Sequence, residues 1–216
     1  MIVTRRALAA ALSLAALAGL ASPPAGRAEA QSAVAPLLAK PVSLPDMALG
    51  SAKAPVTIYE YASMSCPHCA AFEENVFPML KSKYIDSGKL RFVFREFPLD
   101  IKAAAASMLA RCIAGDDATK YFDAVEQLFK MQEQLMEHTI DTLNLIGKQQ
   151  PGMSEAAVAA CEKDQVLLDK LSADAKYAYD ELKVDATPTF FVNGERLKGA
   201  MSFEEIDGKI RSLLRK

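Results

Sequence analysis

The sequence Cys66-Pro67-His68-Cys69 constrains the fold of this 216-residue chain more than any other feature. It follows the run Val-Thr-Ile-Tyr-Glu-Tyr at residues 56–61, whose β-branched and aromatic side chains predict a strand. After it, apolar side chains recur at helical spacing, at Phe72, Val76, Met79 and Leu80. The two cysteines are therefore expected where a strand turns into a helix that begins at Cys66.

The rest of the chain predicts one more strand, a long helical block and a closing hairpin. Pro78 should kink the first helix, Ser87-Gly88 should end it, and residues 90–95 read as the next strand. Helical periodicity then covers residues 101–113, 117–132, 139–149, 154–163 and 165–182.

Asn193-Gly194 lies between strand-like residues 189–192 and 195–198, which predicts a tight hairpin. Ser202 with Glu205 forms a capping box that should begin the last helix. Strand–helix–strand at the start requires a parallel pair, and the hairpin adds antiparallel strands. The expected fold class is α/β: a mixed sheet flanked by helices, with an all-helical insertion at about residues 100–182.

The first thirty residues have the order of a secretory signal peptide. Basic Arg5 and Arg6 precede an apolar stretch at residues 7–21, and Ala28-Glu29-Ala30 offers a cleavage signal before Gln31. Arg5-Arg6 leaves a twin-arginine export route open beside the general one. We expect a signal peptide at residues 1–30, an extended arm at 31–54 and one domain at 55–216, exported to the periplasm.

Charge gives no indication of a nucleic-acid partner. The chain has 25 basic and 27 acidic residues, and removal of residues 1–30 takes away three arginines and one glutamate, which leaves a formal charge of −4. A mildly acidic chain without a basic run lacks the electrostatic footprint of nucleic-acid binding.

Two closely spaced cysteines serve either zinc binding or redox exchange. Structural zinc usually takes four ligands, often from a second close Cys or His pair, and this chain offers none. Redox exchange fits the position, because backbone N–H groups and the helix dipole at a helix start stabilise a thiolate. Cys66 should be the attacking sulfur and Cys69 the resolving one, without a metal or cofactor.

The two residues between the cysteines suit this chemistry. Pro67 at the first helical position loses no hydrogen bond, because its missing N–H would be unpaired there. His68 can add positive charge or a hydrogen bond to the Cys66 thiolate. An inert structural disulfide between Cys66 and Cys69 is the alternative interpretation.

With a preceding strand, a later Thr187-Pro188 and helices between them, the Cys66–Cys69 sequence resembles the DsbA family of periplasmic thiol–disulfide oxidoreductases, of the thioredoxin superfamily. The resemblance runs from about Pro55 to the carboxyl end. It implies a cis peptide bond before Pro188, in a loop that faces the active cysteines and presents backbone to a substrate chain. It also places an acidic residue, Glu60, six positions before the first cysteine. Glu60 could be a solvated strand residue or, if buried near Cys69, a group that moves protons.

The resemblance leaves two activities open. The best-known member has valine before the cis-proline, whereas Thr187 stands here, as in related isomerases and reductases. The isomerases usually carry a dimerisation domain ahead of the catalytic one, and residues 31–54 are too few to build it. We therefore expect a monomeric oxidase, with an isomerase or reductase, or a chaperone-like peptide-binding module, as alternatives.

The expected reaction transfers the Cys66–Cys69 disulfide to reduced or unfolded exported proteins. By resemblance, a membrane quinone-linked oxidase of the DsbB kind would reoxidise the pair. The remaining cysteines, Cys112 and Cys161, fall on two predicted helices of the insertion. An exported chain favours a structural disulfide between them, and two separate buried thiols are the alternative.

Overall fold

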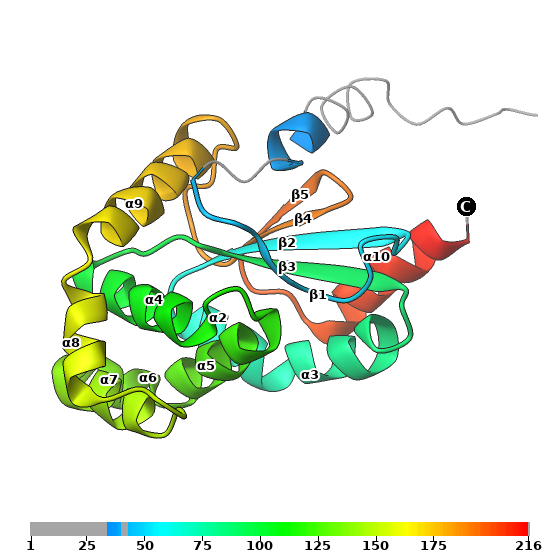
Figure 1. Ribbon diagram of the computed structural model, residues 1–216. Helices are drawn as coiled ribbons and strands as arrows, with labels where there is room; N and C mark the ends of the chain where they lie inside the picture. The colour runs from blue at the N-terminus through cyan, green and yellow to red at the C-terminus, as the bar shows by residue number, and fades with distance from the viewer. Residues whose placement is uncertain (1–33, 40–42, 216) are drawn as a thin grey trace, which may run out of the picture.

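The computed structural model describes residues 34–39 and 43–215. Its centre is a five-stranded mixed sheet in the order β1-β3-β2-β4-β5 (Figure 1). The strands are β1 (Met47–Leu49), β2 (Val56–Ala62), β3 (Leu90–Glu96), β4 (Thr189–Val192) and β5 (Glu195–Lys198). The expected signal peptide, residues 1–30, lies outside the described residues.

Strand pairing follows the expected mixed pattern. β2 runs parallel to β3 and antiparallel to β4, with Glu60 opposite Phe190. β4 and β5 form the predicted hairpin, in which Asn193 and Gly194 have φ of 46° and 85°. Both values lie in the left-handed region that a two-residue hairpin turn requires, and asparagine and glycine tolerate it better than other residues.

Helices cover both faces of the sheet. On one face, α2 (Pro67–Asn75), α3 (Phe77–Leu80), α5 (Ala118–Lys130) and α10 (Phe203–Leu214) pack on a core that contains Phe92, Phe94 and Phe190. On the other face, Leu38 and the end of α9 (Gln165–Asp180) pack against Tyr61 and Phe191. The mixed α/β fold expected from the sequence is confirmed.

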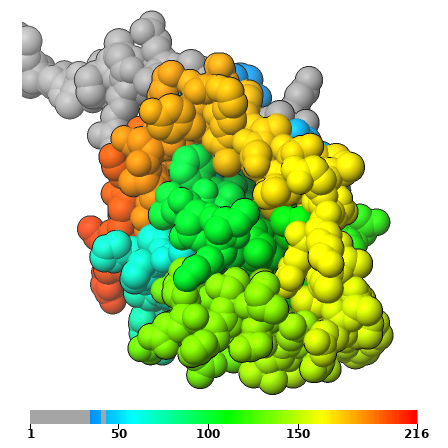
Figure 2. Space-filling model, turned by 90° about the vertical axis from the view of Figure 1, so that its left-hand side faces the viewer, coloured from blue at the N-terminus to red at the C-terminus, as the bar shows by residue number. Residues whose placement is uncertain are grey.

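The block between β3 and β4 is helical throughout, as predicted. It contains α4 (Ile101–Ala114), α5, α6 (Gln132–Glu137), α7 (Thr139–Lys148), α8 (Glu155–Glu162) and α9. Figure 2 looks onto these green-to-yellow helices, beside which the cyan part of the chain that holds β2 and α2 reaches the surface. The structure joins Cys112 on α4 to Cys161 on α8 in a disulfide, with Cα atoms 6.3 Å apart. In the described residues, no helix has the length and apolar character needed to cross a membrane.

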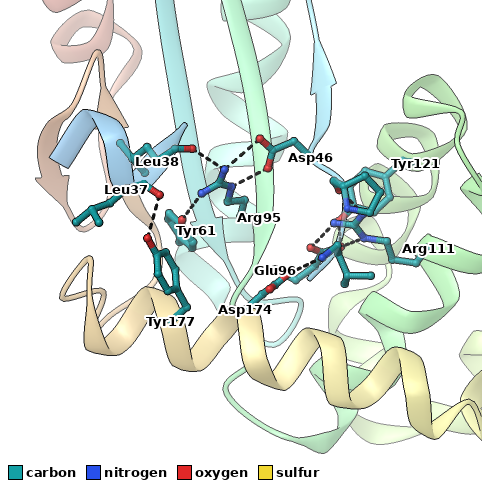
Figure 3. A network of polar contacts seen from close by, with 12 residues as sticks. Leu37, Leu38, Asp46, Tyr61, Arg95, Glu96, Arg111, Tyr121, Asp174 and Tyr177 are labelled. Atoms are coloured by element: carbon teal, nitrogen blue, oxygen red, sulfur yellow. Dashed lines mark hydrogen bonds and ion pairs between the residues drawn. The ribbon is translucent and has the colours of Figure 1, made fainter. Parts of the chain in front are cut away.

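Of the expected extended arm at residues 31–54, the described parts, 34–39 and 43–54, contain a helical turn and a strand, which corrects that expectation. Met47–Leu49 pairs antiparallel with β3 as an edge strand, and residues 34–38 are helical. Arg95 Nη2 donates to the carbonyl of Leu38 at 2.8 Å, and Tyr177 Oη donates to that of Leu37 at 3.3 Å (Figure 3). Leu38 is 2% exposed, so burial of its side chain gives this segment a reason to dock.

The first helix is interrupted near Pro78, as predicted. Helix α2 ends at Asn75, α3 covers one turn, and the chain continues as the π-helix η1 (Lys81–Ile85) before Gly88 at φ 72°. Proline lacks an N–H and its ring crowds the preceding turn, which accounts for the break.

Candidate active site

Cys66 is the residue that begins helix α2. Its φ of −87° and ψ of 117° are extended, and Pro67 occupies the first helical turn. This geometry directs the free N–H groups at the helix start toward the Cys66 sulfur. Cys66 and Cys69 are free thiols, 5% and 0% exposed, so Cys66 is the more accessible of two largely buried sulfurs.

Hydrogen bonds lower the pKa of Cys66 from 9.0 to about 5. The largest contribution is a hydrogen bond from the Cys69 side chain, which outweighs the opposing effect of burial. The Thr187 side chain and the backbone N–H groups of Cys69 and His68 lower the pKa further. A sulfur with such a pKa is a thiolate at neutral pH, and the thiolate is the nucleophilic form of cysteine.

The Thr187–Pro188 peptide bond is cis, as the resemblance implied, and faces Cys66. Cys66 Sγ lies 3.3 Å from the Thr187 carbonyl oxygen and donates to it when protonated. Thr187 Oγ1 is buried and has no other hydrogen-bond partner in the described part of the chain. This hydroxyl is therefore available to donate to the thiolate when the proton has left.

The pKa of the second cysteine is shifted in the opposite direction. The pKa of Cys69 is raised far above its ordinary value, first by burial and then by Cys66 and by Glu60. Glu60 is 1% exposed, so it is not a solvated strand residue. The pKa of Glu60 is also well above its usual range, because of burial and then of Glu73 and Cys66. The two sulfurs are thus strongly unlike, with a stable anion at Cys66 and a stable thiol at Cys69.

His68 contributes to the Cys66 sulfur through its backbone, while its side chain is exposed. A charge or a hydrogen bond from the imidazole stays a prediction. The structure places the backbone N–H of His68 at the Cys66 sulfur, where it lowers the pKa of that thiol. Pro67 is exposed in the same way.

Two further contacts fix the loop ahead of the cysteines, and neither was found from the sequence. Gln132 Nε2 donates to the carbonyls of Met64 at 2.9 Å and Cys66 at 3.0 Å. Ser63 Oγ accepts the N–H of Leu99 at 3.2 Å. Both contacts join residues far apart in sequence, which no local pattern could reveal.

Glu73 is a second buried carboxyl on the active-site helix. It is 5% exposed, and burial raises its pKa to about 8, with Glu126 adding to the increase and Lys130 opposing it. A signal was present in the sequence, because a residue four positions after Cys69 lies on the same face of the helix. Among the described residues, no group of three or more His, Cys, Asp or Glu side chains is placed to hold a metal ion.

Residues 43–212 match a family model described as thioredoxin. The α-DsbA1 protein of Wolbachia pipientis has a crystal structure that superposes with a TM-score of 0.72 at 31% identity, covering 83% of this chain and 95% of that one.

Curated relatives carry names of the same kind. A putative protein-disulfide oxidoreductase of Rickettsia conorii is 35% identical over 152 residues, which is 69% of this chain and 53% of the relative. Disulfide bond formation protein D of Bacillus subtilis is 26% identical over 173 residues, covering 77% of this chain and 76% of that protein. The matched region spans little more than half of the Rickettsia relatives.

The fold and the cysteine pair at the start of α2 define a protein of the thioredoxin superfamily. Within that superfamily, the chain belongs to the DsbA family of thiol–disulfide oxidoreductases.

Proposed function

We propose that this protein introduces disulfide bonds into exported proteins by exchange through Cys66 and Cys69. The observation that carries the proposal is the contrast between the two sulfurs, of which Cys66 has its pKa lowered to about 5 while Cys69 has its own raised. The same contrast argues against an inert structural disulfide at this position.

The low pKa of Cys66 gives the pair its oxidising character. Relative to a thiol of pKa 9.0, a pKa of about 5 stabilises the reduced form about 100-fold at pH 7. For a two-electron couple this corresponds to about 60 mV of added oxidising power. The oxidised form is therefore the less stable one, and transfer of its disulfide to a substrate is favourable.

The reaction proceeds by two exchanges in which atoms and electrons balance. A substrate thiolate attacks Cys66 Sγ, which forms a mixed disulfide and breaks the Cys66–Cys69 bond. Cys69 leaves as a thiolate and takes a proton, for which the buried acid Glu60 is a neighbouring source. A second substrate thiolate then attacks the substrate sulfur of the mixed disulfide, and Cys66 leaves as a stable anion. The substrate is oxidised by two electrons, and the cysteine pair is reduced.

The surroundings of Cys66 suit an extended, apolar substrate chain. The cis bond at Thr187–Pro188 presents its backbone beside the sulfur. Leu99, whose N–H binds Ser63 in the loop ahead of Cys66, is 56% exposed, and Ile101 is 70% exposed. Large apolar side chains on the surface often mark a binding area for other polypeptides. Reduced, unfolded exported proteins are the proposed substrates.

The remaining assignments complete this proposal. The signal-like sequence at residues 1–30 supports export to the periplasm, by the general or the twin-arginine route. A membrane quinone-linked oxidase of the DsbB kind is the proposed reoxidising partner, and the protein is proposed to act as a monomer.

The direct test replaces the attacking sulfur. Cys66→Ser should abolish oxidative folding of a reduced test protein such as RNase A, because serine cannot form the mixed disulfide. Cys69→Ser should instead trap the mixed disulfide, which mass spectrometry detects. Undiminished oxidative folding by Cys66→Ser would show that the protein acts as a peptide-binding module and would end the proposal.

A reductase or isomerase remains the second candidate, because Thr187 stands before the cis-proline and contacts Cys66. The equilibrium potential of the pair against glutathione separates the two activities. A potential close to that of thioredoxin, about −270 mV, would favour the reductase, and a value well above −200 mV the oxidase.

A further inference from the structure

The turn that leads into Cys66 is held by a side chain of the helical insertion. Gln132 Nε2 donates to the Met64 carbonyl at 2.9 Å and to the Cys66 carbonyl at 3.0 Å. The residues that these contacts join are 68 and 66 positions apart in the sequence. One amide nitrogen therefore fixes two carbonyl groups, one on each side of Ser65.

The break between α5 and α6 places Gln132 beside this turn. Helix α5 ends at Lys130, Met131 leaves the helical region with φ −103° and ψ 19°, and Gln132 is the first residue of α6. Leu135 lies one turn further along α6 and is 0% exposed in the main core. Residues three apart share a face of a helix, so burial of Leu135 directs Gln132 toward the interior as well.

The two carbonyls depend on Gln132 to different degrees. The Cys66 carbonyl also accepts the N–H groups of Cys69 at 3.1 Å and Ala70 at 3.2 Å, at the start of α2. Met64 is buried, and its carbonyl has no other hydrogen-bond donor among the described residues. A buried carbonyl without a donor costs free energy, so loss of the Gln132 amide should make the turn rearrange.

The position of this turn decides where the Cys66 sulfur lies. The groups that stabilise its thiolate come from two parts of the fold, namely the backbone N–H groups of His68 and Cys69 on α2, and Thr187 in the cis-proline loop. Cys66 Sγ lies 3.3 Å from the Thr187 carbonyl oxygen, across the gap between these two parts. Hydrogen bonds weaken steeply when their distance and angle depart from the optimum, so a small shift of the turn removes part of the stabilisation.

We propose that Gln132 is a positioning residue for thiol–disulfide exchange, which keeps the Cys66 sulfur beside Thr187 and thereby links the helical insertion to the reactivity of the cysteine pair. Its two donor contacts go to backbone carbonyls and not to the sulfur, so it acts through the position of Cys66. The inference rests on the function proposed for Cys66 and adds that a residue of the insertion tunes the oxidising strength of the pair.

The experiment replaces Gln132 by methionine, which has a similar length and cannot donate a hydrogen bond. The pKa of Cys66 is measured from the ultraviolet absorbance of its thiolate in the reduced protein. In Gln132→Met this pKa should rise by about 0.5–1 unit, and the equilibrium with glutathione at pH 7 should shift about three- to tenfold toward the oxidised protein. Gln132→Glu should raise the pKa at least as much, because a carboxylate accepts hydrogen bonds and does not donate them.

Gln134→Met is the matched control. It makes the same change two residues along α6, at an exposed position, and should leave both the pKa of Cys66 and the glutathione equilibrium unchanged. Thermal unfolding of both redox forms separates a merely structural role, which would destabilise the oxidised and reduced forms equally and leave the pKa of Cys66 as it is. Positioning should instead destabilise the reduced form more than the oxidised form.

Circular dichroism establishes which variants fold, and Gln132→Glu carries the test if Gln132→Met does not fold. An unchanged pKa and glutathione equilibrium in a folded Gln132 variant, or an equal shift in Gln134→Met, would overturn the inference. Oxidative folding by the unaltered protein is measured alongside. Failure of the unaltered protein in that assay would end the proposed function, whereas an unchanged Gln132 variant of an active protein would end this inference alone.

Discussion

Two buried carboxyl groups on neighbouring strands have opposite surroundings. Glu60 on β2 is 1% exposed and has an oxygen without a hydrogen-bond partner among the described residues. Glu96, at the end of β3, is 6% exposed, and both of its carboxylate oxygens accept hydrogen bonds. Arg111 Nη2 donates to its Oε2 at 2.7 Å, and Tyr121 Oη donates to its Oε1 at 2.6 Å (Figure 3).

The difference separates a reactive region from a structural one. Around Cys66, the polar groups of Glu60, Glu73 and Thr187 are buried and incompletely paired. Around Glu96, oppositely charged side chains from different helices and strands are paired, as Glu96 on β3 is with Arg111 on α4. Arg95 likewise binds Asp46, Tyr61 and the Leu38 carbonyl. Buried polar groups without partners lower the stability of the fold, but their pKa values shift strongly with their surroundings, as reactive sites require. Paired groups instead hold helices and strands in position.

The largest expected effect on stability comes from breaking the paired region. Arg111→Met leaves the Glu96 carboxylate buried without its cation and should lower the free energy of unfolding by about 3–5 kcal/mol. Lys130→Met, which removes the exposed pair with Glu126, should cost less than about 1 kcal/mol. Urea unfolding of both variants measures the contrast, and equal losses would show that burial of the pair is unimportant.

The reactive region should make stability depend on redox state and pH. The pKa of Cys66 is about 5 in the folded chain and near 9 when unperturbed, so the thiolate stabilises the reduced fold fully above pH 9 and not at all below pH 5. Between pH 5 and 8, the stability of the reduced form relative to the oxidised form should therefore rise by about 1.4 kcal/mol per pH unit. Thermal unfolding of both forms tests this, with reduced Cys66→Ala as the control that should remove the slope.

The smallest expected effect on stability is at Glu60. Glu60→Gln removes no ion pair and replaces a group that keeps its proton, so stability at pH 7 should change by less than about 1 kcal/mol. The same change at Glu96 leaves the Arg111 cation buried without its carboxylate and should cost about 3–5 kcal/mol. Exchange should slow about tenfold or more in Glu60→Gln, since Cys69 loses a proton source. Stopped-flow exchange with a model thiol measures the rate, and an unchanged rate would exclude Glu60 from proton transfer.

Local signals in the sequence predicted the parts of the fold that depend on neighbouring residues. The helix start at Cys66, the Asn193-Gly194 turn and the capping box at Ser202 all appear where they were expected. Each rests on backbone geometry set within four residues, which is why a linear pattern is sufficient.

Features that depend on distant residues were not predictable in the same way. Strand β1 has three residues, and its pairing with β3 decides its conformation. The helix expected at residues 117–132 ends at Lys130, and a separate helix α6 begins at Gln132, where that side chain reaches the Cys66 carbonyl. The Glu96–Arg111 pair likewise appears only when β3 and α4 are packed together.

The bridge between Cys112 and Cys161 has a consequence for biogenesis. It joins two cysteines that are 49 residues apart in the helical segment. In each newly made chain these are two thiols, and an oxidant that removes two electrons is needed to join them. A protein that introduces disulfides by the proposed exchange would then be one of its own substrates. Oxidised, folded copies would form the Cys112–Cys161 disulfide in copies that are made later.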